Sequence, residues 1–173
     1  MTTRKPWIEN DALAIKQFEI GWAWQRFVGC FFAAHGLEVM LPKLQIRESV
    51  DDIPDFADEW DLSVAGQRIE VKSRHFEFTS DPESFPWDRP FVDTYGGYEV
   101  KKVKPIAYVF VSQKTGALLS TPANEQERDD FWETVVAPDR MRNIAQETFY
   151  VTPRARLSPI TRLVARLKEI GDG

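Results

Sequence analysis

The segment 59–72, EWDLSVAGQRIEVK, constrains the fold more than any other part of the chain. Apolar and polar residues alternate on both sides of Ala65-Gly66, a dipeptide typical of a tight turn, which predicts a β-hairpin that extends to about residue 78. The register that keeps the apolar side chains together pairs Val64 with Gln67, Leu62 with Ile69, and Asp61 with Glu70. A slip of one residue would mix the apolar and charged faces, so the pattern itself specifies the register.

The polar face of this hairpin carries Asp61, Glu70 and Lys72. Two carboxylates directly opposite each other on a sheet repel, and they are tolerated if both are solvated, if one is protonated, or if a cation lies between them. Carboxylate oxygens are the ligands that Mg²⁺ and Mn²⁺ prefer, and such an ion can activate water and stabilise charge on a phosphodiester under attack. Because Lys72 shares the face, its ammonium group can hold the attacking water or the charge that develops on the phosphate.

Asp61, an apolar strand and turn, and then Glu70-Val71-Lys72 together resemble the motif of the PD-(D/E)xK nuclease superfamily. That superfamily includes restriction endonucleases, Holliday-junction resolvases and lambda-type exonucleases. The upstream segments GWAWQRFV (21–28) and GLEV (36–39) are similar to its opening helix and first strand. The motifs cover residues 15–75, and strand order alone extends the resemblance over 105–152.

The resemblance implies an α/β fold with a restriction-endonuclease-like core, in which helices flank a mixed central β-sheet. It also implies that Asp61, Glu70 and the backbone carbonyl of Val71 bind Mg²⁺, for which Mn²⁺ can substitute, and that Lys72 assists the nucleophilic water. The expected activity is hydrolysis of phosphodiester bonds in nucleic acid, with DNA rather than RNA as the expected substrate. The alternative is a catalytically inactive member of the same fold that binds nucleic acid or protein.

Two features of the sequence depart from the superfamily pattern, and a third offers a structural role for Lys72 in place of a catalytic one. Many members carry a catalytic Glu on the first helix where this chain has Gln25, and the nearest acid is Glu19. The literal Pro-Asp pair, Pro54-Asp55, lies in an acidic loop before the hairpin. Glu59 falls opposite Lys72 in the predicted register, so Lys72 could instead be half of a cross-strand ion pair.

Further candidate contacts to nucleic acid flank this motif. Ser73 and Arg74 follow it directly and are expected to face the substrate. Lys101, Lys102 and Lys104 lie near a Gly-Gly pair and are candidates to contact a DNA backbone, or they are ordinary surface lysines.

Length and composition favour one globular domain, 1–173, with a C-terminal helix over 158–170 that is packed on it or appended to it. No apolar run is long enough to span a membrane, and the N-terminus lacks the apolar stretch of a signal peptide. The single cysteine, Cys30, fits a reducing, cytoplasmic setting. The net charge of −5 argues against a protein that coats nucleic acid. A homodimer is an open alternative, because symmetric cleavage of a duplex requires one.

Hydrophobic periodicity and turn residues predict the remaining elements. Helices are predicted from Asn10 or Asp11 to His35, over 124–136 and over 158–170, with a short helix or turn over 98–104; strands are predicted over 37–47, 106–113, 117–121 and 148–152.

Overall fold

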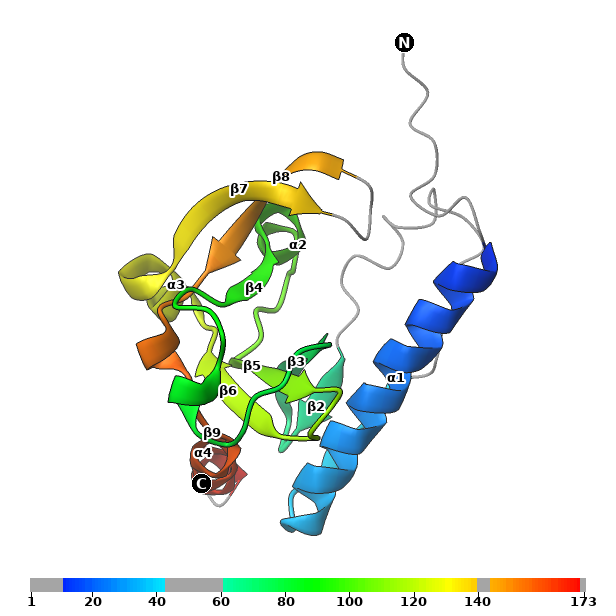
Figure 1. Ribbon diagram of the computed structural model, residues 1–173. Helices are drawn as coiled ribbons and strands as arrows, with labels where there is room; N and C mark the ends of the chain where they lie inside the picture. The colour runs from blue at the N-terminus through cyan, green and yellow to red at the C-terminus, as the bar shows by residue number, and fades with distance from the viewer. Residues whose placement is uncertain (1–10, 43–60, 140–143, 172–173) are drawn as a thin grey trace.

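The computed structural model describes residues 11–42, 61–139 and 144–171, which form two β-sheets and four α-helices (Figure 1). The larger sheet has the strand order β1 (Val39–Met40), β2 (Leu62–Val64), β3 (Gln67–Arg74), β5 (Ala107–Ser112), β6 (Leu118–Pro122) and β9 (Ser158–Pro159). The smaller sheet has the order β4 (Phe91–Thr94), β8 (Ile144–Val151) and β7 (Glu133–Asp139). The helices are α1 (Asp11–Ala34), α2 (Tyr95–Glu99), α3 (Glu125–Phe131) and α4 (Ile160–Gly171), with short 3₁₀ turns at Pro82–Ser84 and Arg154–Arg156.

The larger sheet is mixed, because β3 and β5 are parallel while its other neighbouring strands are antiparallel. The prediction of an α/β fold with a mixed central sheet and helices is therefore confirmed for the described residues. None of the described helices is both long and apolar enough to cross a membrane.

The predicted hairpin register is confirmed. Leu62 pairs with Ile69 and Val64 with Gln67 across β2 and β3. Ala65 and Gly66 both have positive φ, 48° and 72°, the combination that a tight two-residue hairpin turn of type I′ requires. The hairpin therefore closes where the sequence placed its turn.

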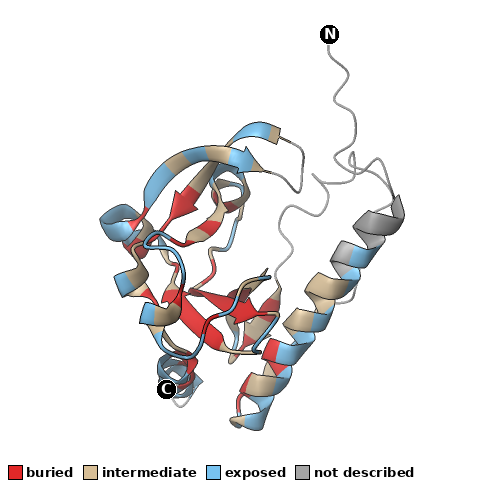
Figure 2. Cartoon of the chain, in the orientation of Figure 1, coloured by how far each residue is buried: buried red, intermediate tan, exposed pale blue. Residues whose placement is uncertain are grey.

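One face of the larger sheet forms the main core with α1 and α4. Val28 and Phe32 of α1 and Leu163 and Leu167 of α4 are buried against apolar side chains of β2, β3 and β5. Figure 2 shows these central strands as the most continuously buried part of the chain, while both helices expose their outer faces. The C-terminal helix is thus packed on the sheet. It begins at Ile160, since Ser158–Pro159 form β9.

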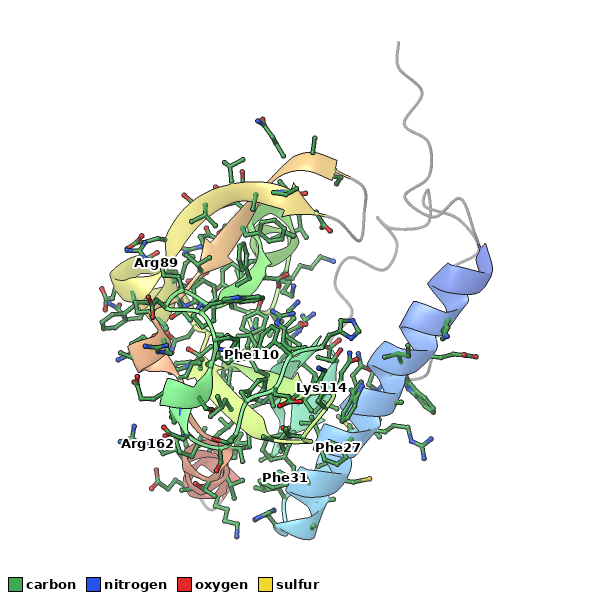
Figure 3. All side chains as sticks on the ribbon, viewed as in Figure 1. Phe27, Phe31, Arg89, Phe110, Lys114 and Arg162 are labelled. Atoms are coloured by element: carbon green, nitrogen blue, oxygen red, sulfur yellow. The ribbon has the colours of Figure 1, made fainter. Side chains whose placement is uncertain are left out.

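The opposite face of the larger sheet meets the smaller sheet through aromatic side chains. Tyr108 of β5 packs with Tyr98, Trp132 and Tyr150 in one buried cluster. Phe110, labelled in Figure 3, is fully buried in a second cluster on the same face. Because side chains alternate along a strand, Arg68, Glu70 and Lys72 of β3 point toward this face rather than toward the main core.

Several predicted boundaries were wrong. The helix predicted over 124–136 is only α3, which Asn124 caps at Glu127 N, and the residues from Glu133 onward form strand β7. The strand predicted over 148–152 is the end of the longer β8, which ends at Val151. Of the short helix or turn predicted over 98–104, only residues 98–99 are helical, as the end of α2. Of the strand predicted over 37–47, residues 37–42 are described and only Val39–Met40 of these form a strand, β1, while residues 43–47 lie outside the described residues.

Candidate active site

The residues predicted for the site come together where α1, the β2–β3 hairpin and β5 meet. Glu70 and Lys72 lie on β3, and Asp61 directly precedes β2. The parallel pairing of β3 with β5 places Tyr108 beside Glu70. The chain between these two strands contains β4 and α2, which bring two further charged residues to the same place, as described below.

Asp61 is fixed by two hydrogen bonds. Its Oδ2 accepts a bond of 2.6 Å from the backbone N–H of Val71, and its Oδ1 accepts one of 2.8 Å from Nε2 of Gln25. Burial raises the pKa of Asp61, although the charge of Lys72 and the Val71 N–H act against that rise. The helix position singled out by the resemblance, Gln25, is therefore in direct contact with the first acid of the motif, while Glu19 is exposed on α1.

Glu70 is a buried carboxylate with an incomplete set of partners. Its side chain is 6% exposed, and its Oε1 accepts no hydrogen bond from the described residues. The nearest cation is Arg68, whose Nε lies 3.5 Å from Oε1. Burial and then the charge of Asp61 raise the pKa of Glu70 to about 8. This raised pKa favours the protonated form of Glu70 near neutral pH, and a further cation bound beside it would favour the ionised form.

Lys72 pairs with a carboxylate that the sequence analysis did not identify. Its Nζ lies 3.2 Å from Oδ1 of Asp93 on β4, and it also lies over the ring of Tyr108. Burial alone would lower the pKa of Lys72, but Asp93, Glu70 and Asp61 outweigh burial and raise it, so the ammonium form is favoured. The alternative partner, Glu59, lies outside the described residues.

Asp93 lies between the lysine side chains of the site and binds both of them. Its Oδ2 accepts hydrogen bonds from Nζ of Lys101 at 2.9 Å and from the hydroxyl of Tyr108 at 2.6 Å. Burial by itself would raise the pKa of Asp93, but Lys72, Lys101 and the Tyr108 hydroxyl hold it well below its usual range. Burial raises the pKa of Tyr108 far above its ordinary value, so the hydroxyl remains a donor.

A local signal for Asp93 exists in the sequence. The segment DTYGGYE has a helix-capping Thr followed by a short helix, and Thr94 Oγ1 indeed accepts a hydrogen bond from Gly97 N. The residue before such a cap is held at the start of a helix, near its positive end. What the sequence does not show is that Asp93 on β4 lies beside Lys72 on β3.

The other residues predicted to contact nucleic acid bind different parts of the structure, and not all of them lie at the site. Ser73 Oγ accepts a hydrogen bond from Gln113, and Arg74 donates to the carbonyl of Phe91 at 2.7 Å. Burial lowers the pKa of Arg74 to about 10. Lys104 donates to two carbonyls at the end of α2, and Lys102 is exposed. Of the three predicted lysines, only Lys101 is brought into the Asp93 cluster.

The site thus has an acidic side, Asp61 with Glu70, and a basic side, Lys72 and Lys101 around Asp93. Within the described residues no group of three or more Asp, Glu, His or Cys side chains is arranged to hold a metal ion. A metal here would rely on the two acids, backbone carbonyls, water and substrate oxygens. Such a small protein ligand set is usual for Mg²⁺, which keeps several waters and binds phosphate oxygens.

Comparisons with protein-family models, curated proteins and solved structures gave no match to this chain.

Proposed function

We propose that this protein is a metal-dependent nuclease that hydrolyses phosphodiester bonds in nucleic acid, with DNA rather than RNA as the expected substrate, Mg²⁺ as its cofactor and Mn²⁺ able to substitute. The observation that carries the proposal is the pair formed by Asp61 and Glu70. Their charges interact in a buried setting, and Oε1 of Glu70 accepts no hydrogen bond from the described residues. Two such carboxylates are costly to ionise without a cation, and a divalent ion between them relieves both burial and repulsion.

The residues present fit a Mg²⁺ ion. Asp61 and Glu70 supply hard oxygen ligands, and the Val71 carbonyl is a third candidate. The N–H and C=O groups of one strand residue point toward the same neighbouring strand, and the Val71 N–H points to Asp61, so its carbonyl is on the same side. A bound Mg²⁺ would polarise a phosphoryl oxygen and lower the pKa of its bound water.

Lys72 supplies the second part of the chemistry. Of the three N–H groups of its ammonium, one is used by Asp93 in the described residues. The remaining donors can orient the attacking water or stabilise negative charge on the phosphorus centre. Asp93 keeps this ammonium charged and limits its movement, which favours positioning and charge stabilisation over proton abstraction by Lys72.

The proposal also includes the type of fold, the cellular location and the oligomeric state. The restriction-endonuclease-like core is supported by the order of α1, the β2–β3 hairpin and the parallel strand β5, with the motif on β3. A cytoplasmic location rests on the exposed free Cys30, and a homodimer stays a prediction that light scattering can test.

Cleavage assays with matched variants test the proposal. The purified chain is incubated with linear, circular, branched and single-stranded DNA and with RNA, in Mg²⁺, Mn²⁺ or EDTA. We expect metal-dependent cleavage that Asp61→Ala and Lys72→Ala abolish, while Lys168→Ala, on the exposed side of α4, leaves it unchanged. Far-ultraviolet circular dichroism confirms that the variants are folded. Absence of cleavage of every substrate by the wild-type protein would refute the proposal.

A catalytically inactive binding module is the second candidate, and two contacts favour it. The amide of Gln25 donates to Asp61 Oδ1, and Lys72 is engaged with Asp93 rather than with the acidic pair. Mn²⁺ calorimetry separates the two candidates. Binding that is lost in both Asp61→Asn and Glu70→Gln supports the nuclease, and the absence of Mn²⁺ binding supports the binding module.

A further inference from the structure

Asp93 connects two lysines from different parts of the chain. Oδ1 accepts from Lys72 Nζ and from the backbone N–H of Thr94, and Oδ2 accepts from Lys101 Nζ and the Tyr108 hydroxyl. The side chains of Asp93 and Lys101 are 10% and 9% exposed. Asp93 therefore holds the Lys101 ammonium group inside the site, and it also binds that of Lys72, whose side chain is 25% exposed.

The two ammonium groups retain unused hydrogen-bond donors. Each carries three N–H groups. Lys72 uses one on Asp93, and Lys101 uses two, on Asp93 Oδ2 and on the carbonyl of Gly97 at 3.1 Å. In the described residues, three donors are left for water or a ligand, two on Lys72, whose side chain is 25% exposed, and one on the nearly buried Lys101. Leaving such donors unpaired is unfavourable, so the arrangement suits a ligand rich in acceptor oxygens.

The charge balance indicates the same kind of ligand. One carboxylate, Asp93, is shared by two ammonium groups, so one positive charge remains uncompensated on this side. Arg74 adds a further positive charge, which interacts with both Lys72 and Asp93.

We infer that Lys101 is a second catalytic lysine, which binds a non-bridging oxygen of a substrate phosphate together with Lys72, and that Asp93 is the residue that positions both lysines. This inference rests on the proposed function for its substrate, a phosphodiester held between the acidic and basic sides. The ligand class of this subsite, a phosphate group, follows from the donors and charges alone.

Binding of inorganic phosphate in the presence of Mg²⁺, measured by calorimetry on the full chain, tests Lys101 without requiring cleavage. We expect Lys101→Gln to weaken binding by about tenfold or more, the effect of losing one charge-assisted hydrogen bond. Lys114→Gln removes the same charge at an exposed position between β5 and β6, labelled in Figure 3, and should leave binding unchanged. Equal affinities for Lys101→Gln and Lys114→Gln, or no binding by the wild type, would overturn the inference.

Phosphate binding by an Asp93→Asn variant tests the role of Asp93, because a positioning role and a simple charge effect predict opposite changes in affinity. Removing its negative charge strengthens anion binding by Coulomb attraction, whereas loss of positioning weakens it. We expect Asp93→Asn to bind phosphate about tenfold more weakly than the wild type, and Asp93→Glu to restore part of the loss. A folded Asp93→Asn protein that binds phosphate as well as the wild type, or better, contradicts the positioning role. If Asp93→Asn does not fold, Asp93→Glu and the Lys101 variants decide the question.

Cleavage measured on the same proteins separates this inference from the proposed function. Loss of cleavage in Lys101→Gln by about a hundredfold is expected, because a donor to developing charge typically contributes that much. If phosphate binds through Lys101 but no nucleic acid is cleaved, the nuclease proposal is wrong and the phosphate subsite stands. If cleavage is found and Lys101→Gln leaves it unchanged, the nuclease stands and the second lysine is wrong.

Discussion

The raised pKa of Glu70 makes a quantitative prediction about stability and pH. The pKa rises from 4.5, its ordinary value and the value expected in the unfolded chain, to about 8 in the folded protein. Between these two values the folded state holds a proton that the unfolded state has lost. The free energy of unfolding must therefore fall as the pH rises from about 4.5 to about 8, and then become constant in this respect.

The size of the fall follows from the same two values. Each pKa difference of one is worth about 1.4 kcal/mol, so the shift from 4.5 to about 8 corresponds to about 5 kcal/mol. That is a large part of the ~5–15 kcal/mol that stabilises a typical domain. Asp93, whose pKa is held low, contributes in the opposite direction and only in acid, since its stabilisation is lost as the pH falls below its ordinary value of 3.8.

Urea unfolding of the metal-free protein in EDTA, from pH 5 to pH 8.5, measures this effect. The Glu70→Gln variant should lose most of the pH dependence and should be more stable than the wild type at pH 8, because its amide does not ionise. Glu169→Gln, an exposed site on α4, should keep the wild-type slope. Parallel curves for Glu70→Gln and the wild type would falsify the reasoning.

The same reasoning predicts how Mg²⁺ changes the free energy of unfolding. Under the proposed function Mg²⁺ would bind the ionised form of Glu70, so its addition should remove much of the destabilisation at pH 8. At a hundred times its dissociation constant a ligand stabilises the folded state by about 2.7 kcal/mol. Binding should also release protons near neutral pH, which calorimetry in buffers of different ionisation enthalpy can count. A metal effect that is as large in Glu70→Gln as in the wild type would contradict the assignment of this ligand.

Three substitutions test the elements that support the site, each followed by urea unfolding. Gly97→Ala should destabilise the protein by about 1–3 kcal/mol, because its new Cβ would lie 2.5 Å from Thr94 Oγ1, whereas Gly96→Ala meets nothing within 4 Å and should be neutral or stabilising. Equal effects of the two substitutions would exclude this steric explanation. Leu62→Ala, at a fully buried position, should cost about 2–5 kcal/mol, and a loss below 1 kcal/mol would contradict its place in the core. Ala65→Asn should raise the free energy of unfolding by about 1 kcal/mol, because Asn tolerates positive φ better than Ala, and a decrease would argue against the type I′ turn.

The parts of the fold that the sequence predicted well are those set by local periodicity. The hairpin register follows from alternation with a period of two, and Leu62 and Ile69 are paired as expected. The long helix α1 ends near Gly36, whose φ of +80° is unfavourable for other residues. The strands β5 and β6 were recognisable as apolar runs separated by the turn at Gly116.

The smaller sheet was missed because the pairing of β4 is not local and because β7 was read as part of a helix. Strand β4 is short, follows a proline-rich stretch, and is paired with β8, far along the chain. The error in 124–136 has a local cause: the charged residues of α3 and the alternating residues of β7 were read as one helix, although β7 is paired with β8, the next strand along the chain. Trp132 marks the junction, since it is buried among the aromatic side chains between the sheets.

Only part of the candidate site was predicted from the sequence. Asp61, Glu70 and Lys72 were identified from their shared face on the hairpin, and Gln25 from its position on the first helix. Asp93 could not be found in this way, because its importance depends on which lysines and tyrosine the fold places around it. Hairpin periodicity gives residues on one strand pair, whereas a cluster that spans two sheets needs the tertiary structure.

The contact between Asp93 of the smaller sheet and Lys72 of the larger one has a consequence for the folding of this protein. Strands β3 and β5 are parallel, so the whole segment between them, which contains β4 and α2, must be in place before the site is complete. Assembly of the charged cluster and docking of the two sheets are therefore one cooperative event. A ligand held at the cluster would slow hydrogen exchange in β4 and β8 as well as in β3, and transient opening of the smaller sheet would switch the site off without unfolding the hairpin.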